Sequence, residues 1–270
     1  MKLGYIDYLN CYPFYYRLFE KEKLDGVSVV SAYPSALNAS IARGELDMSP
    51  ISSAAFPEIQ NEAYLLRDFC LSSIGYVRSV VLASNVPIED LQEKTVGLSS
   101  ASQTSVILLK ILLRKYYGIT PVYVSSPPLP DLSNIDAALV IGNEAMTDVI
   151  SKGKFMYDIG ELWLLKTGYP VVFAVFALRN DALSTKKSFV DAIIASFHSS
   201  LRCLETEREA LIAGASTRYP NINASYLNEY YGLLKFSFTA ELQNALAFYY
   251  TLAAEEGLLK PVERIHWYPA

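Results

Sequence analysis

Short apolar runs alternate with amphipathic stretches along the first two-thirds of the chain, and this alternation constrains the fold more than any other feature. Apolar runs of strand length occupy residues 3–6, 27–32, 46–51, 75–83, 95–98, 122–124, 137–141 and 170–178. Stretches with helical spacing fall between several of them, for example at 14–19, 34–41 and 106–117. Strands that alternate with helices build parallel βαβ units, so the pattern predicts an α/β fold.

Polar residues follow two of the predicted strands. Asn10 comes after the first strand, and Ser52 and Ser53 come after the third. In an open α/β sheet, ligands bind beyond the carboxyl ends of the strands. These side chains are therefore candidates for a ligand site, although Asn10 could instead support a tight turn.

The pattern changes after residue 180. Helical patterns cover 188–204, 205–213, 224–231 and 239–256, with no strong strand among them. A helical end after two rounds of α/β pattern indicates two lobes. We expect residues 1–87 and 179–270 to form the first lobe, and residues 88–178 to form a second lobe inserted into it. The crossings near 83–85 and 178–180 would form a hinge beside a ligand cleft between the lobes.

Charge and hydropathy exclude several classes of function. The net charge of −5 is spread along the chain without a basic run, which argues against a nucleic-acid groove. No stretch approaches the ~20 uncharged apolar residues of a membrane span. The N-terminus carries Asp7 and shows no apolar signal-peptide core. We therefore expect a cytoplasmic protein that binds neither nucleic acid nor membrane.

A serine-rich loop at residues 99–105 is the strongest local indication of a binding site. It joins a predicted strand to an apolar helix and contains Ser99, Ser100, Ser102, Thr104 and Ser105. Backbone N–H groups and the dipole at a helix start favour a carboxylate or phosphate. Plain N-capping by one hydroxyl group is the alternative. The loop lacks the glycines and the lysine of a Walker motif.

Other residues with catalytic or binding chemistry are few. Arg78 lies inside a β-prone run, where it would either meet a ligand carboxylate or form a surface ion pair. His198 and His266 are far from any predicted strand end, so they indicate neither a Ser–His pair nor a metal site. Cys11 lies near the predicted cleft, but no histidine accompanies it as a base. The residues alone predict a two-lobed anion-binding protein and no particular reaction.

Several short motifs occur in a fixed order along the chain. They are Gly4-Tyr5-Ile6-Asp7-Tyr8-Leu9-Asn10-Cys11-Tyr12-Pro13, Gly44-Glu45-Leu46-Asp47 with Ile51-Ser52-Ser53, Val77-Arg78-Ser79-Val80, Ala101-Ser102-Gln103-Thr104-Ser105, Ile141-Gly142-Asn143-Glu144-Ala145, Asp158-Ile159-Gly160-Glu161-Leu162-Trp163 and Thr167-Gly168-Tyr169-Pro170. Together they resemble the chorismate dehydratases of the futalosine route to menaquinone. Any one motif is weak, but their order is specific.

The resemblance implies a type II periplasmic-binding-protein-like fold with the ligand cleft between the lobes. It also implies the removal of water from chorismate, a dianion, to give 3-[(1-carboxyvinyl)oxy]benzoate. No cofactor and no metal are implied. The partner would be the small-molecule substrate, and the protein would be a monomer or a homodimer. Because no protein base is obvious, the substrate's own side-chain carboxylate would take the ring proton.

The same resemblance implies roles for site residues. Asn10 and Ser79 would be catalytic. The substrate-binding residues would be Ser52, Ser53, Arg78, Ser102, Gln103, Thr104, Ser105, Asn143 and Gly168. Asn10 and the two serines at 52–53 would hydrogen-bond the leaving hydroxyl or stabilise enolate charge. The helix start at 102–105, together with Arg78 and Ser79, would hold a carboxylate.

Two departures from the family pattern concern the substrate contacts. Ala54-Ala55-Phe56 stand where the family often has an acidic or aromatic pair, and Gln103 stands where a small residue is commoner. Two other functions stay open. One is the sister enzyme that forms 1,4-dihydroxy-6-naphthoate, whose opening motif differs from this one. The other is a non-catalytic binding protein, because fold does not determine function.

Overall fold

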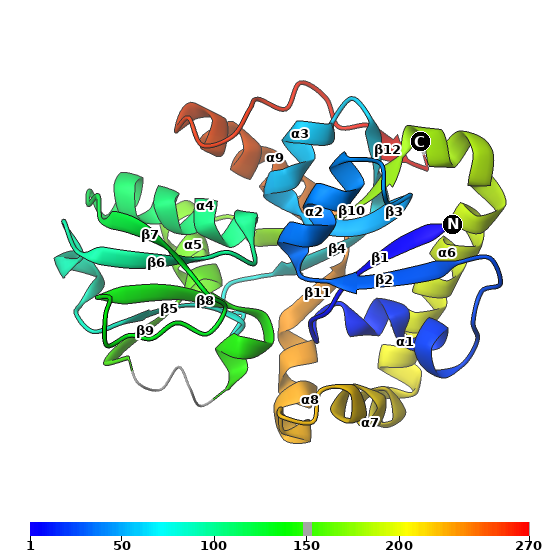
Figure 1. Ribbon diagram of the computed structural model, residues 1–270, viewed down its shortest axis with the longest axis horizontal. Helices are drawn as coiled ribbons and strands as arrows, with labels where there is room; N and C mark the ends of the chain where they lie inside the picture. Colours follow the sequence, from blue (N-terminus) through cyan, green and yellow to red (C-terminus); the bar gives the residue numbers. More distant parts are fainter. Residues whose placement is uncertain (148–152, 270) are drawn as a thin grey trace.

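Two sheets, each flanked by helices, form two lobes side by side (Figure 1). The computed structural model describes residues 1–147 and 153–269. The first sheet has seven strands in the order β11-β4-β10-β3-β1-β2, with β12 paired to β4. These strands are β1 (Lys2–Ile6), β2 (Ser28–Ala32), β3 (Met48–Ser52), β4 (Ala63–Ser73), β10 (Val171–Arg179), β11 (Leu234–Ser237) and β12 (Trp267–Tyr268).

The second sheet has five strands in the order β7-β6-β8-β5-β9. They are β5 (Val80–Ser84), β6 (Thr95–Ser99), β7 (Val122–Ser126), β8 (Ala137–Ile141) and β9 (Phe155–Asp158). The predicted parallel units are present, since β1 pairs in parallel with β2 and β3, and β6 with β7 and β8. Each sheet also contains antiparallel strands: β10 and β11 run against their neighbours in the first sheet, and β5 does so in the second.

Helices cover both sheets. They are α1 (Tyr12–Glu20), α2 (Pro34–Ala42), α3 (Phe56–Ile59), α4 (Gln103–Ile111), α5 (Ile159–Thr167), α6 (Asn180–Thr206), α7 (Arg208–Arg218), α8 (Ala224–Leu233) and α9 (Ala240–Glu255). Single turns occur at η1 (Ser53–Ala55), η2 (Ile88–Asp90) and η4 (Gly142–Met146), and α4 continues into the π-helical turn η3 (Leu112–Tyr116). No helix in the described part of the chain is long and apolar enough to cross a membrane.

One large apolar core runs through both lobes. In the first lobe, α1 packs on α6, and the ring of Phe14 meets those of Phe69, Phe176 and Phe197 at centroid distances of 5.8, 4.6 and 5.7 Å. Burial of such rings is the main stabilising contribution in a core of this size. The α/β, two-lobed prediction is confirmed.

Two strands of the first sheet are not indicated by the sequence pattern. β4 is its longest strand, but Arg67 and Asp68 interrupt the apolar run, so the strand does not stand out in the sequence. β11 has only four residues and directly follows α8, in the part of the chain where we expected no strand. Its pairing with β4 stabilises it, and that pairing joins residues about 160 positions apart in sequence.

The crossings between the lobes differ from the predicted boundaries. β5 was expected in the first lobe but lies in the second sheet, and β10 was expected in the second lobe but lies in the first sheet. The chain therefore crosses at residues 74–79 and 168–170, and the strand predicted at 75–83 begins only at Val80. Both strands are almost entirely apolar, so their composition cannot show which sheet they join.

Candidate active site

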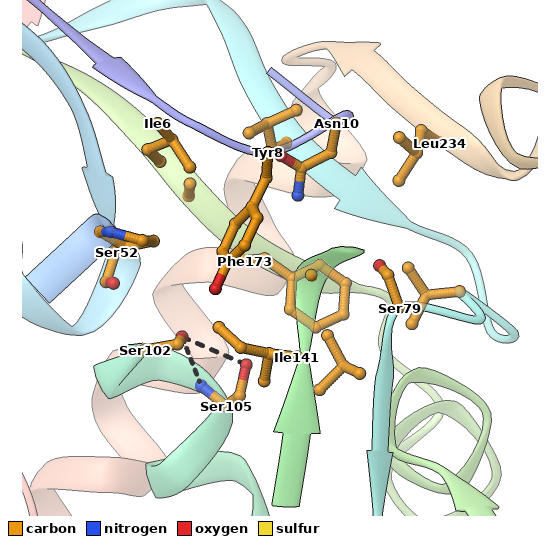
Figure 2. Close-up of a pocket in the computed structure, with 16 residues that line it drawn as sticks. Ile6, Tyr8, Asn10, Ser52, Ser79, Ser102, Ser105, Ile141, Phe173 and Leu234 are labelled. Carbon is orange, nitrogen blue, oxygen red and sulfur yellow. Dashed lines mark hydrogen bonds between the residues drawn. The ribbon is translucent and has the colours of Figure 1, made fainter. Parts of the chain in front are cut away.

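A cavity lies between the two lobes, at the carboxyl ends of β1 and β3 (Figure 2). It is lined by Ile6, Tyr8, Asn10, Pro34, Ser52, Leu71, Val77, Ser79, Val80, Ser102, Ser105, Ile141, Gly142, Phe173, Ala174 and Leu234. All of these side chains are uncharged, and most are apolar. Such a cavity suits an organic ring whose polar groups meet a few hydroxyl and amide groups.

Five of the predicted site residues line this cavity: Asn10, Ser52, Ser79, Ser102 and Ser105. They come from the loop after β1, the end of β3, the crossing before β5 and the start of α4. Both lobes therefore contribute polar groups to one space. This placement agrees with the rule that ligands bind beyond the carboxyl ends of the strands.

Tyr230, on α8, connects the two residues predicted to be catalytic. Its buried hydroxyl donates a hydrogen bond to Ser79 Oγ at 2.9 Å. Burial raises the pKa of Tyr230, while hydrogen bonds with Ser79 and Asn10 lower it, and burial dominates, so the phenol stays protonated. Because Ser79 Oγ accepts this bond, its own hydrogen can point to a ligand. Asn10 Oδ1 is buried and has no hydrogen-bond partner among the described residues.

Ser102 and Ser105 place the start of α4 against the cavity. Ser102 is the N-cap: its Oγ accepts a hydrogen bond from Ser105 N at 3.4 Å and lies 3.2 Å from Ser105 Oγ. The capping alternative is thus confirmed for Ser102. An anion in the cavity would also face the positive end of the α4 dipole, so the anion site stays a prediction that this geometry allows.

Gln103 and Thr104 hold α4 against the first lobe instead of facing the cavity. Thr104 Oγ1 accepts a hydrogen bond from Ala54 N at 3.1 Å and donates one to Phe173 O at 2.9 Å. Gln103 Oε1 accepts one from Asn38 Nδ2 at 3.0 Å. Successive helix residues point in directions about 100° apart, so residues next to the cap turn away from the cavity. Neither residue lines the cavity, and the substrate-binding prediction for both stays a prediction.

Ser53, Asn143 and Gly168 also have structural contacts outside the cavity. Ser53 donates to Val172 O at 2.7 Å, and Asn143 Oδ1 accepts from Leu9 N at 3.0 Å, which joins the two lobes. Gly168 ends α5 in the left-handed conformation with φ +76°, a position that favours glycine. None of the three lines the cavity, and their substrate contacts stay predictions.

Arg78 points away from the cavity. Its guanidinium carbon lies 3.6 Å from the centroid of the Tyr226 ring, and its Nη1 lies 2.9 Å from Glu229 Oε2, both on α8. Its φ of +70° is uncommon for a residue with a side chain. The structure therefore has the ion pair that was the alternative, and the contact of Arg78 with a ligand carboxylate stays a prediction.

Asp158, the N-cap of α5, holds the first crossing in place. Only 7% of Asp158 is exposed. Its carboxylate accepts hydrogen bonds from Val77 N at 3.2 Å, Arg78 N at 2.6 Å and Glu161 N at 3.0 Å. Burial raises the pKa of Asp158, and the three N–H donors oppose this effect. The carboxylate thus positions Ser79, the next residue along the crossing.

Replacing Asp158 by alanine is expected to lower the free energy of unfolding by about 2–4 kcal/mol, because buried N–H groups lose their acceptor. Asp158→Asn keeps one acceptor oxygen and is expected to lose about half as much. Urea unfolding followed by circular dichroism measures both variants. A change below about 0.5 kcal/mol for the alanine variant would show that water replaces the carboxylate without loss.

Tyr8 is a cavity residue that the sequence analysis did not single out. It follows β1 within the opening motif, and only 3% of the residue is exposed. Its ring packs on Gly142, whose φ is +68°. The sequence signal was its place between the strand and Asn10, but an aromatic residue beside a strand is usually part of the core.

No cluster of three His, Cys, Asp or Glu residues that could hold a metal ion occurs within residues 1–147 and 153–269. Cys11 is fully buried, and burial raises the pKa of its thiol well above the usual value, which disfavours the nucleophilic thiolate. His198 pairs with Asp68 at 3.1 Å on the surface, away from the cavity.

A family model described as menaquinone biosynthesis matches residues 1–255. The chain belongs to this family. Relatives within the menaquinone biosynthesis family include a chorismate dehydratase from Thermus thermophilus, 32% identical over 77% of this chain and 80% of that protein. A 1,4-dihydroxy-6-naphtoate synthase from Streptomyces coelicolor is 26% identical over 82% of this chain and 80% of that protein. The predicted family resemblance is confirmed.

Solved structures share the fold at low identity. A protein from Archaeoglobus fulgidus superposes with a TM-score of 0.76 and 17% identity, covering 96% of this chain and 98% of its own. The periplasmic aliphatic sulphonate binding protein from Escherichia coli gives a TM-score of 0.67 and 15% identity, covering 100% of this chain and 92% of its own. The periplasmic-binding-protein-like fold predicted for this family member is therefore confirmed.

Proposed function

We propose that this member of the menaquinone biosynthesis family is a chorismate dehydratase, a hydro-lyase that removes water from chorismate to give 3-[(1-carboxyvinyl)oxy]benzoate. The observation that carries the proposal is the cavity between the lobes, where Asn10, Ser79 and the start of α4 surround an apolar space. The 32% identity to a chorismate dehydratase, against 26% to a naphthoate synthase, supports it.

The reaction breaks one ring C–H bond and one ring C–O bond, and forms the last double bond of a benzene ring. Aromatisation supplies much of the driving force, so the protein mainly has to position the substrate and stabilise charge. None of the side chains that line the cavity is a carboxylate or an imidazole. In our proposal the enolpyruvyl carboxylate of the substrate takes the ring proton and then gives it to the leaving hydroxyl group, which departs as water.

The polar groups around the cavity fit separate parts of this task. Ser79, whose Oγ accepts a hydrogen bond from Tyr230, donates its own hydrogen to the substrate. Asn10 offers its amide oxygen, which has no partner among the described residues, to the departing hydroxyl group. A carboxylate of the substrate lies at the start of α4, where uncharged donors and the helix dipole replace a cationic side chain.

The test is to mix the purified protein with chorismate and follow the products by chromatography and mass spectrometry. Loss of one water to give the enolpyruvyl benzoate is the expected result. If chorismate stays intact but raises the melting temperature, the protein is a binding protein of the same fold. If chorismate neither reacts nor stabilises the protein, the proposed substrate is wrong.

A further inference from the structure

Tyr8 separates two spaces at the interface of the lobes. On one side is the enclosed cavity of the candidate active site. On the other is an outer, more open pocket lined by Asp7, Tyr33, Glu144 and Arg218 among others. Tyr8 lines both, and it is the aromatic residue nearest to Asn10 in the loop after β1.

The hydroxyl group of Tyr8 is buried and makes no well-aligned hydrogen bond with a described residue, and the acceptor beside it is the carboxylate of Glu144. Figure 2 shows its side chain extending from the loop after β1 into the cavity, with the hydroxyl group on the side of Ser102 and Ser105. Burial and the nearby carboxylate of Glu144 raise the pKa of Tyr8, so the phenol keeps its proton. A buried donor without a well-aligned acceptor is costly, and a ligand carboxylate that takes the place of Glu144 as its acceptor would remove that cost.

The start of α4 lies in the same part of the cavity. Ser102 and Ser105 line it, and α4 is nine residues long, so its N-terminus carries a helix dipole. Among the residues that the structure describes, no cationic side chain lines the cavity to balance a bound carboxylate. Neutral donors must therefore recognise the carboxylate. A hydrogen bond from a neutral donor to a charged carboxylate is stronger than one from the same donor to a neutral group.

The second lobe holds the Tyr8 ring in this direction. A side chain on Gly142 would place its Cβ 2.5 Å from Tyr8 Cζ, so the ring lies directly on the backbone of η4. One residue further, Asn143 Oδ1 accepts a hydrogen bond from Leu9 N at 3.0 Å. The ring direction thus depends on contact between the lobes, and the hydroxyl group is preorganised only when they meet.

We propose that the Tyr8 hydroxyl group donates a hydrogen bond to the ligand carboxylate held at the start of α4, and that this donor selects carboxylates over neutral ligands of the same shape. The inference rests on the proposed function, because it takes the bound molecule to be a carboxylate on a planar ring. The inference adds Tyr8 to the residues that contact the substrate and assigns it a role in the selection of carboxylates over neutral ligands.

The experiment compares two probes of the same shape, 3-hydroxybenzoate and 3-hydroxybenzamide, by isothermal titration calorimetry. Wild type is expected to prefer the carboxylate. Tyr8→Phe is expected to weaken carboxylate binding about tenfold or more and to leave amide binding within about twofold, because only the charged acceptor loses a strong bond. Tyr33→Phe is the matched control, since its hydroxyl group lies 3.5 Å from Glu144 Oε1 in the outer pocket and should change neither affinity.

Chorismate turnover is measured on the same three proteins. If Tyr8→Phe removes the carboxylate preference while wild type fails to turn over chorismate, the inference holds and the proposed function is wrong. Alternatively, wild type dehydrates chorismate while Tyr8→Phe lowers the affinity for both probes equally, or changes neither affinity. In either case Tyr8 only packs in the cavity wall, and the inference is wrong. An absence of carboxylate preference in wild type would also overturn the inference.

Discussion

Replacing Asn10 by alanine is expected to lower the turnover number for chorismate by at least about 100-fold, the usual loss when one preorganised polar group at the reacting centre is removed. Asn10 Oδ1 is buried beside the cavity and has no other partner among the described residues, so its role is toward the ligand. The Michaelis constant is expected to change much less, because the interaction strengthens as the hydroxyl group leaves.

Steady-state kinetics with product detection measures this effect, and the melting temperature shows whether the variant folds. Asn134→Ala is the matched control, because it makes the same change in an exposed loop of the second lobe, where Nδ2 donates to Asp131. We expect this control to keep its activity. If Asn10→Ala retains turnover within about threefold of wild type, Asn10 supports only the turn after β1, the alternative that the sequence allowed.

Gly142→Ala is expected to weaken both the folded state and ligand binding. The new Cβ would lie 2.5 Å from Tyr8 Cζ, and the backbone φ of +68° is strained for alanine. The strain alone costs about 1–2 kcal/mol, and forcing the Tyr8 ring aside adds about 1–3 kcal/mol. Because the contact between Tyr8 and Gly142 joins the lobes, forcing the Tyr8 ring aside should separate the lobes and lower the affinity for chorismate.

Gly118→Ala separates these two contributions. Gly118 has nearly the same φ, +69°, but no atom lies within 4 Å of the added Cβ. We expect Gly118→Ala to lower the free energy of unfolding in urea only by the cost of the backbone strain. Its ligand affinity should equal that of wild type. In the background Tyr8→Ala, Gly142→Ala should cost no more than Gly118→Ala. Equal unfolding free energies and ligand affinities for the two single variants would show that the Tyr8–Gly142 contact is not a constraint.

The family and the general chemistry of the site were accessible from the sequence because they depend on local patterns. Alternating apolar runs predicted the α/β lobes, polar residues at strand ends marked Asn10 and Ser52, and the serine-rich loop predicted the start of α4. Each of these signals lies within about ten residues of chain, the range over which strand, helix and cap preferences act.

The direction of side chains around the site was not accessible in this way. Thr104 and Ser105 are neighbours of the same polar type, yet Thr104 holds the first lobe and Ser105 lines the cavity. Arg78 has a positive φ and contacts Tyr226 and Glu229 on α8, and no residue pattern around it indicates either feature. Tyr8 looked like a core residue until its unpaired hydroxyl group was located.

The sequence by itself determined the class of fold and the family, because hydrophobic periodicity is local and the order of short motifs can be read along the chain without knowing how it folds. Only the tertiary structure decided which sheet β5 and β10 join, which polar groups reach the cavity and which residues of the second lobe hold Tyr8. These features depend on pairing and packing between residues far apart in sequence. Apolar strands and hydroxyl side chains fit several partners equally well until the two lobes are folded against each other.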